Sequence, residues 1–238
     1  MTTLANLKLF TTHPHKCSYL DEKIATTVFV DPNAKINQDV YSRLSEIGFR
    51  RSGQHLYRPQ CHSCQECVPV RIPAADFKPS RQQKRCLKAN SDIEFSIIDS
   101  IDTEEHYSLY ERYISIRHQD GDMYPPSRAQ YDSFLTSEWN LTKFIEFKLD
   151  SALIGVAVID QLDHGISAVY TFFEPELHKR SLGTYAILIE IQLALESGLP
   201  YVYLGYWIRQ CVKMNYKTKF KPLEVYTDSE WQEFDDCQ

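Results

Sequence analysis

The chain has 238 residues, of which 43% are hydrophobic and 24% are charged. This composition is that of a globular protein with enough chain for one large domain or two small ones. With 15 tyrosines, 12 phenylalanines and only 8 glycines, the sequence excludes a disordered or fibrous protein. The net charge of −6 excludes a protein whose whole surface coats nucleic acid, so any RNA contact must be local.

The cations are unevenly distributed. From Lys78 to Lys88 there are five cations and no acid, and the same holds from Arg209 to Lys221. A solvated helix face explains one such cluster, whereas two of them in an acidic protein favour an anionic partner.

The sequence predicts a cytoplasmic location. The start, MTTLANLKLF, is too short and polar for a secretory signal, and the most apolar stretch carries Glu190, Gln192 and Glu196, which exclude a membrane span. Seven cysteines in such a chain are expected to be metal ligands, redox thiols or core residues before disulfides.

The first half predicts mostly helices. In chain order we expect a helix capped by Asn37 and stopped by Gly48, a loop-rich segment at 58–79, and a basic helix capped by Ser80 that reaches Ala89. A strand at 93–98 follows, and then a helix that begins at a capping box of Asp102 and Glu105 and ends at Arg117. A polar loop at 118–126 leads to a last helix, from Ser127 to near Trp139.

The second half predicts strands. Residues 144–149, 154–160 and 166–173 form β-branched or aromatic runs separated by short turns, which is typical of an antiparallel meander. A helix at 182–197 and a strand at 201–206 follow, with a boundary between an N-terminal domain (1–95) and a C-terminal domain (96–238). The order matches the core of GNAT-type N-acetyltransferases, so we expect an α+β fold with a mixed sheet flanked by helices.

In that fold, the turn before the long helix binds a phosphate. The candidate here runs from His178 to Tyr185, where Gly183 lets the backbone approach a ligand and the helix start favours an anion. Lys179 and Arg180 add positive charge next to Thr184. A basic turn of this kind also occurs without any ligand.

The run Cys61-His-Ser-Cys64-Gln-Glu-Cys67 predicts a metal site. Thiolates at this spacing converge on one centre from a tight loop, and they suit zinc or an iron–sulfur cluster. Cys17 is the natural fourth ligand. The alternative is a metal-free set of reduced thiols that pack as small hydrophobic side chains.

Several blocks resemble the arginyl-tRNA–protein transferase family, most closely its bacterial branch, the aspartate/glutamate leucyltransferases. They include Gly48-Phe-Arg-Arg-Ser52, Phe77-Lys-Pro-Ser-Arg-Gln-Gln-Lys84, Arg117-His-Gln-Asp-Gly-Asp-Met123, Val169-Tyr-Thr-Phe-Phe173 and Lys213-Met-Asn-Tyr-Lys217. The resemblance covers nearly the whole chain. It implies a GNAT-like enzyme that takes aminoacyl-tRNA in place of acetyl-CoA, requires no cofactor for the transfer, and marks proteins with N-terminal Asp or Glu for degradation by the N-end rule pathway.

The resemblance to this family suggests roles for particular residues. The loop with His118, Asp120 and Asp122 is where a proton acceptor is expected, although either aspartate also suits a simple turn. An acidic acceptor needs a cation, for which we choose Arg50, Arg51 and Arg58. Aromatic strand residues, which are more often core, could line a leucine pocket: Tyr170, Phe172 and Tyr203. Phosphates of the tRNA would meet Lys78, Arg81, Lys84, Arg85, Lys179, Arg180, Gly183, Thr184, Lys213 and Lys217.

The sequence is also compatible with other functions. The first is transfer of arginine by an enzyme of the same family, and the second is an acyl-CoA N-acetyltransferase that binds CoA at 181–185. A third is a non-enzymatic metal-knuckle protein that binds RNA. A redox sensor built on Cys17 and Cys61–Cys67 is a further alternative, and it is compatible with the transferase.

Overall fold

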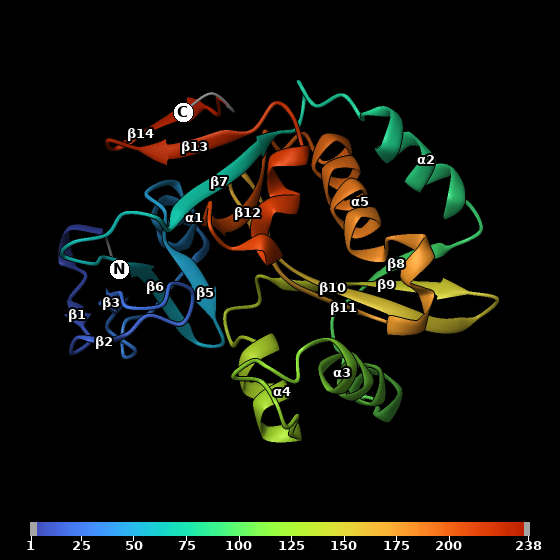
Figure 1. Ribbon diagram of the computed structural model, residues 1–238, viewed down its shortest axis with the longest axis horizontal. Helices are drawn as coiled ribbons and strands as arrows, with labels where there is room; N and C mark the ends of the chain where they lie inside the picture. Colours follow the sequence, from blue (N-terminus) through green and yellow to red (C-terminus); the bar gives the residue numbers. More distant parts are fainter. Residues whose placement is uncertain (1–3, 236–238) are drawn as a thin grey trace.

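The computed structural model describes residues 4–235 as a large sheet covered by helices, with a smaller sheet beside it (Figure 1). The helices are α1 (Gln38–Glu46), α2 (Arg81–Ala89), α3 (Glu104–Arg117), α4 (Arg128–Leu135) and α5 (Leu182–Glu196), with 3₁₀ helices η1 (Leu4–Asn6), η2 (Pro175–Arg180) and η3 (Val212–Lys219). The predicted caps Asn37, Ser80 and Ser127 accept the expected backbone N–H bonds, and Ser80 forms a complete capping box with Gln83.

Two helix boundaries differ from the prediction. Thr103, rather than Asp102, caps α3 by accepting a hydrogen bond from the His106 N–H. Helix α4 ends at Leu135, four residues before Trp139, because the Thr136 backbone is extended.

Eight strands form the large sheet, in the order β14-β13-β7-β12-β11-β10-β9-β8. They are β7 (Val68–Pro73), β8 (Glu94–Ile98), β9 (Thr142–Leu149), β10 (Ala152–Leu162), β11 (Gly165–Phe173), β12 (Tyr201–Trp207), β13 (Glu224–Thr227) and β14 (Glu230–Glu233). The predicted meander β9-β10-β11 is confirmed, and α5 then leads to β12, which pairs in parallel with β11. This arrangement confirms the expected α+β fold with a mixed sheet between helices.

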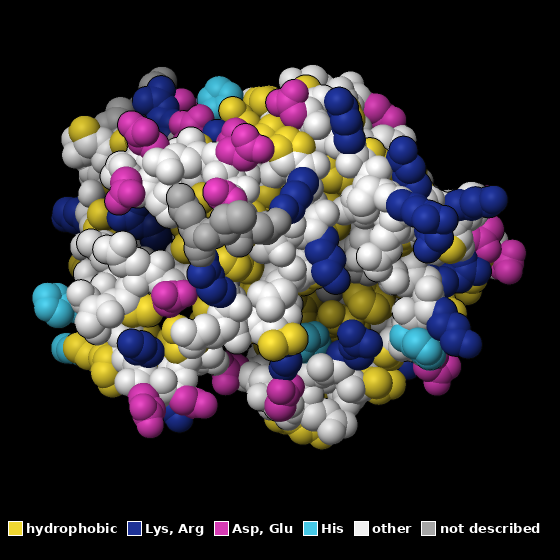
Figure 2. Space-filling view, turned by 45° about the horizontal axis from the view of Figure 1, so that its top comes forward, with side chains coloured by type: hydrophobic (Ala, Val, Ile, Leu, Met, Phe, Trp, Pro, Cys, Tyr) yellow, Lys and Arg dark blue, Asp and Glu magenta, His cyan; other side chains and the backbone are white. Residues whose placement is uncertain are grey.

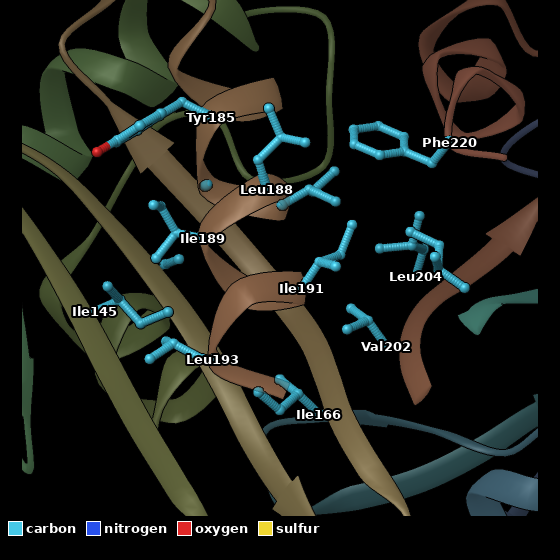
Figure 3. Packing of buried hydrophobic residues seen from close by; sticks show 14 of the residues in the cluster. Ile145, Ile166, Tyr185, Leu188, Ile189, Ile191, Leu193, Val202, Leu204 and Phe220 are labelled. Atoms are coloured by element: carbon cyan, nitrogen blue, oxygen red, sulfur yellow. The ribbon is translucent and has the colours of Figure 1, made fainter. Parts of the chain in front are cut away.

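Each face of the large sheet has its own core. Helices α2 and α5 cover one face and α3 and α4 the other (Figure 1). On the α5 side, Leu188, Ile189 and Ile191 pack against apolar side chains of the sheet such as Ile145 and Val202 (Figure 3). Burying each of these side chains contributes about 1.5–3 kcal/mol, so α5 is anchored along nearly its whole length.

The smaller sheet is built from the N-terminal segment. Its order is β1-β4-β6-β5, with β1 (Leu9–Thr11), β4 (Thr27–Val30), β5 (Arg50–Ser52) and β6 (His55–Pro59), while β2 (His15–Lys16) pairs with β3 (Ile24–Ala25). A third core cluster joins this sheet to α1, to Leu162 at the end of β10 and to Tyr203 of β12.

The segment predicted as loop-rich at 58–79 contains the main difference from expectation. Its residues 68–73 form β7, which lies between β12 and β13 in the large sheet. The large sheet therefore draws strands from both sides of the predicted 95/96 boundary. No helix among residues 4–235 has the length and apolarity needed to span a membrane.

Candidate active site

The parallel pair β11 and β12 separates part of the way along. The strands are in register only from Gly165 to Ser167 opposite Tyr201 to Tyr203. Beyond that point β11 continues with a bulge, because Val158 of β10 faces Tyr170 while Ile159 faces Ala168, which leaves Val169 without a partner. We call the region between the diverging strands the splay site.

The side chain of Arg50, from β5, lies where β11 and β12 begin to diverge. Its guanidinium donates to the carbonyl oxygens of Ala168 on β11 and Tyr203 on β12, which the divergence would otherwise leave unpaired. Gly205 makes room for it: a Cβ there would lie 3.3 Å from the Arg50 Nε, and the φ of +80° also favours glycine. Arg50 thus holds the two strands apart as a polar wedge.

Glu190 of α5 lies next to this wedge and is fully buried. Neither of its carboxylate oxygens has a hydrogen-bond partner among the described residues. Burial raises the pKa of Glu190 to about 8, and Arg50 opposes the shift. A carboxyl group left in this state is unusual outside functional sites.

Two residues of η3 reach the same region. Burial raises the pKa of Tyr216 to about 12, with Glu190 and Tyr113 adding to the shift, although the Tyr216 side chain is still 42% exposed. Lys217 is buried and donates to the Tyr206 carbonyl, while burial and Arg50 lower its pKa to about 7. Tyr216 therefore links the interior of the splay site to the surface.

The predicted polar loop lies near η3. His118 ends α3, and its ring centroid lies 5.1 Å from that of Tyr113. The Asp120 carboxylate forms an ion pair with the Lys213 ammonium at 2.7 Å. Burial lowers the pKa of His118, and Lys213 and Arg117 lower it further. Figure 2 shows a hollow below the centre of the face, bordered by hydrophobic, His, and Lys or Arg side chains.

Of the predicted catalytic residues, the structure brings His118 and Asp120 together around Lys213. Asp122 is exposed, and its carbonyl accepts a long bond from the Gln130 side chain. Their proposed role in proton transfer stays a prediction.

Two of the predicted leucine-pocket residues belong to the core. Phe172 is fully buried against Tyr110 and Tyr131, and Tyr203 is 3% exposed in the cluster under the small sheet. Tyr170, which follows the bulge, is half-buried, and its hydroxyl has no partner among the described residues. Of these three side chains, only that of Tyr170 is not fully enclosed in a core cluster.

The predicted acceptor arginines separate into three environments. Arg51 was expected to bind the acceptor, but its guanidinium is fully buried and binds both carboxylate oxygens of Asp160 at 2.6 and 3.0 Å. Its role is therefore to stabilise the fold. Arg50 is the wedge described above. Arg58 donates to the Ile47 carbonyl and lines a separate cavity of about 520 Å³.

The turn before α5 is only partly free for an anion. Ser181 has a left-handed conformation at the helix start without capping it, and Gly183 and Thr184 follow in the first turn. Arg180 is occupied by a bidentate pair with Asp92 at 2.8 and 2.9 Å, so the structure gives it a fold-stabilising contact. Lys179 is exposed.

The two basic segments lie side by side. Gln83 of α2 donates to the Lys219 carbonyl, and the Phe77 and Phe220 rings stack at 6.1 Å. The exposed cations of this basic surface are Lys78, Arg81, Lys84, Arg85, Lys88, Arg209, Lys213, Lys219 and Lys221. In Figure 2, Lys and Arg side chains gather toward the right of the view, on the side where Figure 1 shows α2. Lys217 does not belong to this surface, because it is buried.

The four predicted metal ligands, Cys17, Cys61, Cys64 and Cys67, line the 520 Å³ cavity that also contains Arg58. Burial and the other three thiols raise the pKa of Cys67 to about 12. No group of three or more His, Cys, Asp or Glu in residues 4–235 has an arrangement that could hold a metal ion. The donor set is soft enough for zinc or iron, and the metal site stays a prediction.

The sequence did not single out Glu190, Tyr113 or Tyr216 as site residues. The one available signal was the glutamate in the otherwise apolar segment 185–191, where a helix that is buried all round leaves no polar face for it.

Known proteins share most of this sequence. Residues 15–85 match the family model described as arginine-tRNA-protein transferase, N terminus, and residues 105–227 match its C terminus. A Teredinibacter turnerae protein is 57% identical over 99% of this chain and 97% of its own length, and a Saccharophagus degradans protein is 54% identical over 98% and 100%. Both are named aspartate/glutamate leucyltransferase.

Likeness to solved structures is weaker. L-PGS from Bacillus licheniformis is 11% identical with a TM-score of 0.46, over 59% of this chain and 45% of that one. The strand order, rather than this likeness, supports the fold assignment.

Proposed function

The chain belongs to the arginine-tRNA-protein transferase family, and we propose that it transfers leucine from charged tRNA to proteins that begin with Asp or Glu. The observation that supports this choice is the 52–57% identity, over 97–99% of the chain, to relatives named aspartate/glutamate leucyltransferase. Addition of leucine would mark the acceptor for degradation by the N-end rule pathway.

The reaction is aminolysis of an ester. The acceptor's α-amine attacks the leucyl carbonyl carbon, a C–N bond forms, the bond to the 3′-terminal ribose oxygen breaks, and the proton lost by the amine ends on that oxygen. An α-amine has a pKa of about 7.7–8.0, so roughly a tenth is uncharged at pH 7. The enzyme therefore needs positioning and charge stabilisation more than a strong base.

The splay site is suited to the aminoacyl end of the tRNA. It lies between two strands that pair only over their first three residues, β11 carries a bulge at Val169 beside it, and the partly exposed Tyr216 of η3 lies next to it. His118, whose loop also lies near η3, has a pKa below its usual range and can accept a proton at neutral pH.

The tRNA itself would lie on the basic surface of α2 and η3. These cations are exposed and lie beside the splay site, because Lys213 and Lys217 belong to the same 3₁₀ helix. Phosphate contacts of this kind position the RNA without reading its sequence.

For the acceptor, Arg58 remains the best candidate of the three predicted arginines. Its guanidinium lines the 520 Å³ cavity, and a bidentate contact with an Asp or Glu side chain would give the required selectivity.

A transfer assay tests the proposal. Purified protein is incubated with labelled Leu-tRNA or Arg-tRNA and with peptides that begin with Asp, Glu or Ala. We expect label from Leu-tRNA on the Asp and Glu peptides only. Transfer from Arg-tRNA in its place would identify an arginyl-transferring enzyme, and RNA binding without any transfer would overturn the enzyme assignment.

A further inference from the structure

The Glu190 carboxylate lacks a counterion in the described part of the chain. Both oxygens are buried without a hydrogen-bond partner, and the nearby cation Arg50 directs its N–H groups to the carbonyls of Ala168 and Tyr203 instead. Lys217, the other cation of the site, donates to the Tyr206 carbonyl. A buried carboxyl with no partner costs free energy, which a cationic ligand would recover.

The position of Glu190 shows where such a ligand would enter. Tyr216 of η3 lies close enough to Glu190 for the carboxylate to raise the pKa of the Tyr216 hydroxyl. The Tyr216 ring is 42% exposed. A cationic ligand would therefore reach the carboxylate by displacing the Tyr216 side chain.

We propose that Glu190 binds the α-ammonium group of the leucyl residue carried by the tRNA, and so fixes the ester carbonyl in the splay site. This inference rests on the proposed function. The α-ammonium nitrogen is separated from the ester carbonyl carbon by a single carbon atom, so a contact at the nitrogen orients the carbonyl directly.

The chemistry favours the donor over the acceptor as the source of this cation. The acceptor's amine must be uncharged when it attacks, and an ion pair with a buried carboxylate would stabilise its charged, unreactive form. The donor's ammonium takes no part in bond formation. An ion pair with Glu190 would hold its charge, and this contact could persist into the transition state.

Binding of three RNAs tests the inference. The ligands are tRNA that carries leucine through a stable 3′-amide link, the same tRNA with N-acetylated leucine, and uncharged tRNA. The proteins are the wild type, Glu190→Gln, and the matched control Glu196→Gln, whose carboxylate is exposed on the same helix. The wild type and the control should bind leucyl-tRNA about tenfold or more tightly than the N-acetylated form. Glu190→Gln should bind the two equally.

Kinetics supply a second measurement. Glu190→Gln should raise KM for Leu-tRNA and leave KM for an Asp-peptide unchanged, and Glu190→Asp should restore part of the preference for the free ammonium. If Glu190→Gln does not fold, the wild-type preference and its partial retention in Glu190→Asp decide the question.

Three results would overturn the inference: no preference in the wild type, an unchanged preference in Glu190→Gln, or a fall in kcat with both donors while binding is unaffected. The last would assign the carboxylate to the acceptor amine. If the wild type transfers no leucine at all, the proposed function fails instead.

Discussion

Glu190→Gln should change the pH dependence of stability as well as substrate binding. Burial raises the pKa of Glu190 from 4.5 to about 8, with Arg50 opposing the shift and the Tyr216 hydroxyl nearby. The folded protein therefore holds this proton more tightly than the unfolded chain. Stability is fully present below pH 4.5 and is lost as the pH rises toward 8, because the folded state must then either keep the proton or bury an unpaired charge.

The expected magnitude follows from the size of the shift. Each unit of pKa difference corresponds to about 1.4 kcal/mol. Between about pH 5 and pH 9 the wild type should therefore lose about 4 kcal/mol of unfolding free energy through this one group. That is a large part of the total stability of an ordinary domain, about 5–15 kcal/mol. A glutamine of the same shape does not titrate and should remove this loss.

Urea unfolding at several pH values measures the effect. The difference in unfolding free energy between Glu190→Gln and the wild type should grow from pH 5 to about pH 8 and then level off, whereas Glu196→Gln, on the exposed side of α5, should follow the wild type. If the difference for Glu190→Gln stays within about 1 kcal/mol over this range, then the carboxyl group is solvated or paired in solution, and the description of the splay site is incorrect.

Three other changes test different parts of the structure. A Cβ at Gly53 would lie 2.1 Å from the backbone of α4, so Gly53→Ala should lower stability by more than about 2 kcal/mol, whereas Gly198→Ala, with a similar positive φ but open space around it, should cost only about 1 kcal/mol in the same denaturant titration. Lys213→Gln removes a charge that lowers the pKa of His118, so if His118 accepts the proton, the acidic limb of the pH–rate profile should move to higher pH; an unchanged limb would point to another group. Lys84→Gln should weaken tRNA binding and reduce the slope of log Kobs against log salt by about one, and an unchanged slope would place the RNA elsewhere.

The local elements were predictable from the sequence because their signals are local. The Asn37, Ser80 and Ser127 side chains each bond a backbone N–H only three residues ahead, so the sequence around each of them is sufficient to locate a helix start. The β9-β10-β11 meander could be predicted as well, since short turns bring strands that are neighbours in the sequence together in the sheet.

Strand β7 could not be found in this way. Its partners β12 and β13 are more than 120 residues further along the chain, and Pro69 and Pro73 make the segment resemble a loop. The pairings of β1, β4 and β6 in the small sheet likewise join segments that are separated along the chain. The β13–β14 hairpin is local, but its acidic sequence carries no clear strand signal.

The roles of the arginines show the same limit at the site. Arg50 and Arg51 are adjacent in sequence, yet one bonds carbonyls of two separating strands while the other pairs with Asp160, 109 residues away. Because successive side chains of a strand point to opposite faces, neighbouring arginines meet different surroundings. Only the fold determines which of them is near a substrate.

The place of β7 also affects how the protein is made. Residues 68–73 leave the ribosome well before both of their neighbouring strands, at 201–207 and 224–227, have been made. The early segment must therefore wait for more than 120 further residues before its backbone can pair within the sheet. A nascent chain truncated before residue 201 would lack the neighbours that β7 needs.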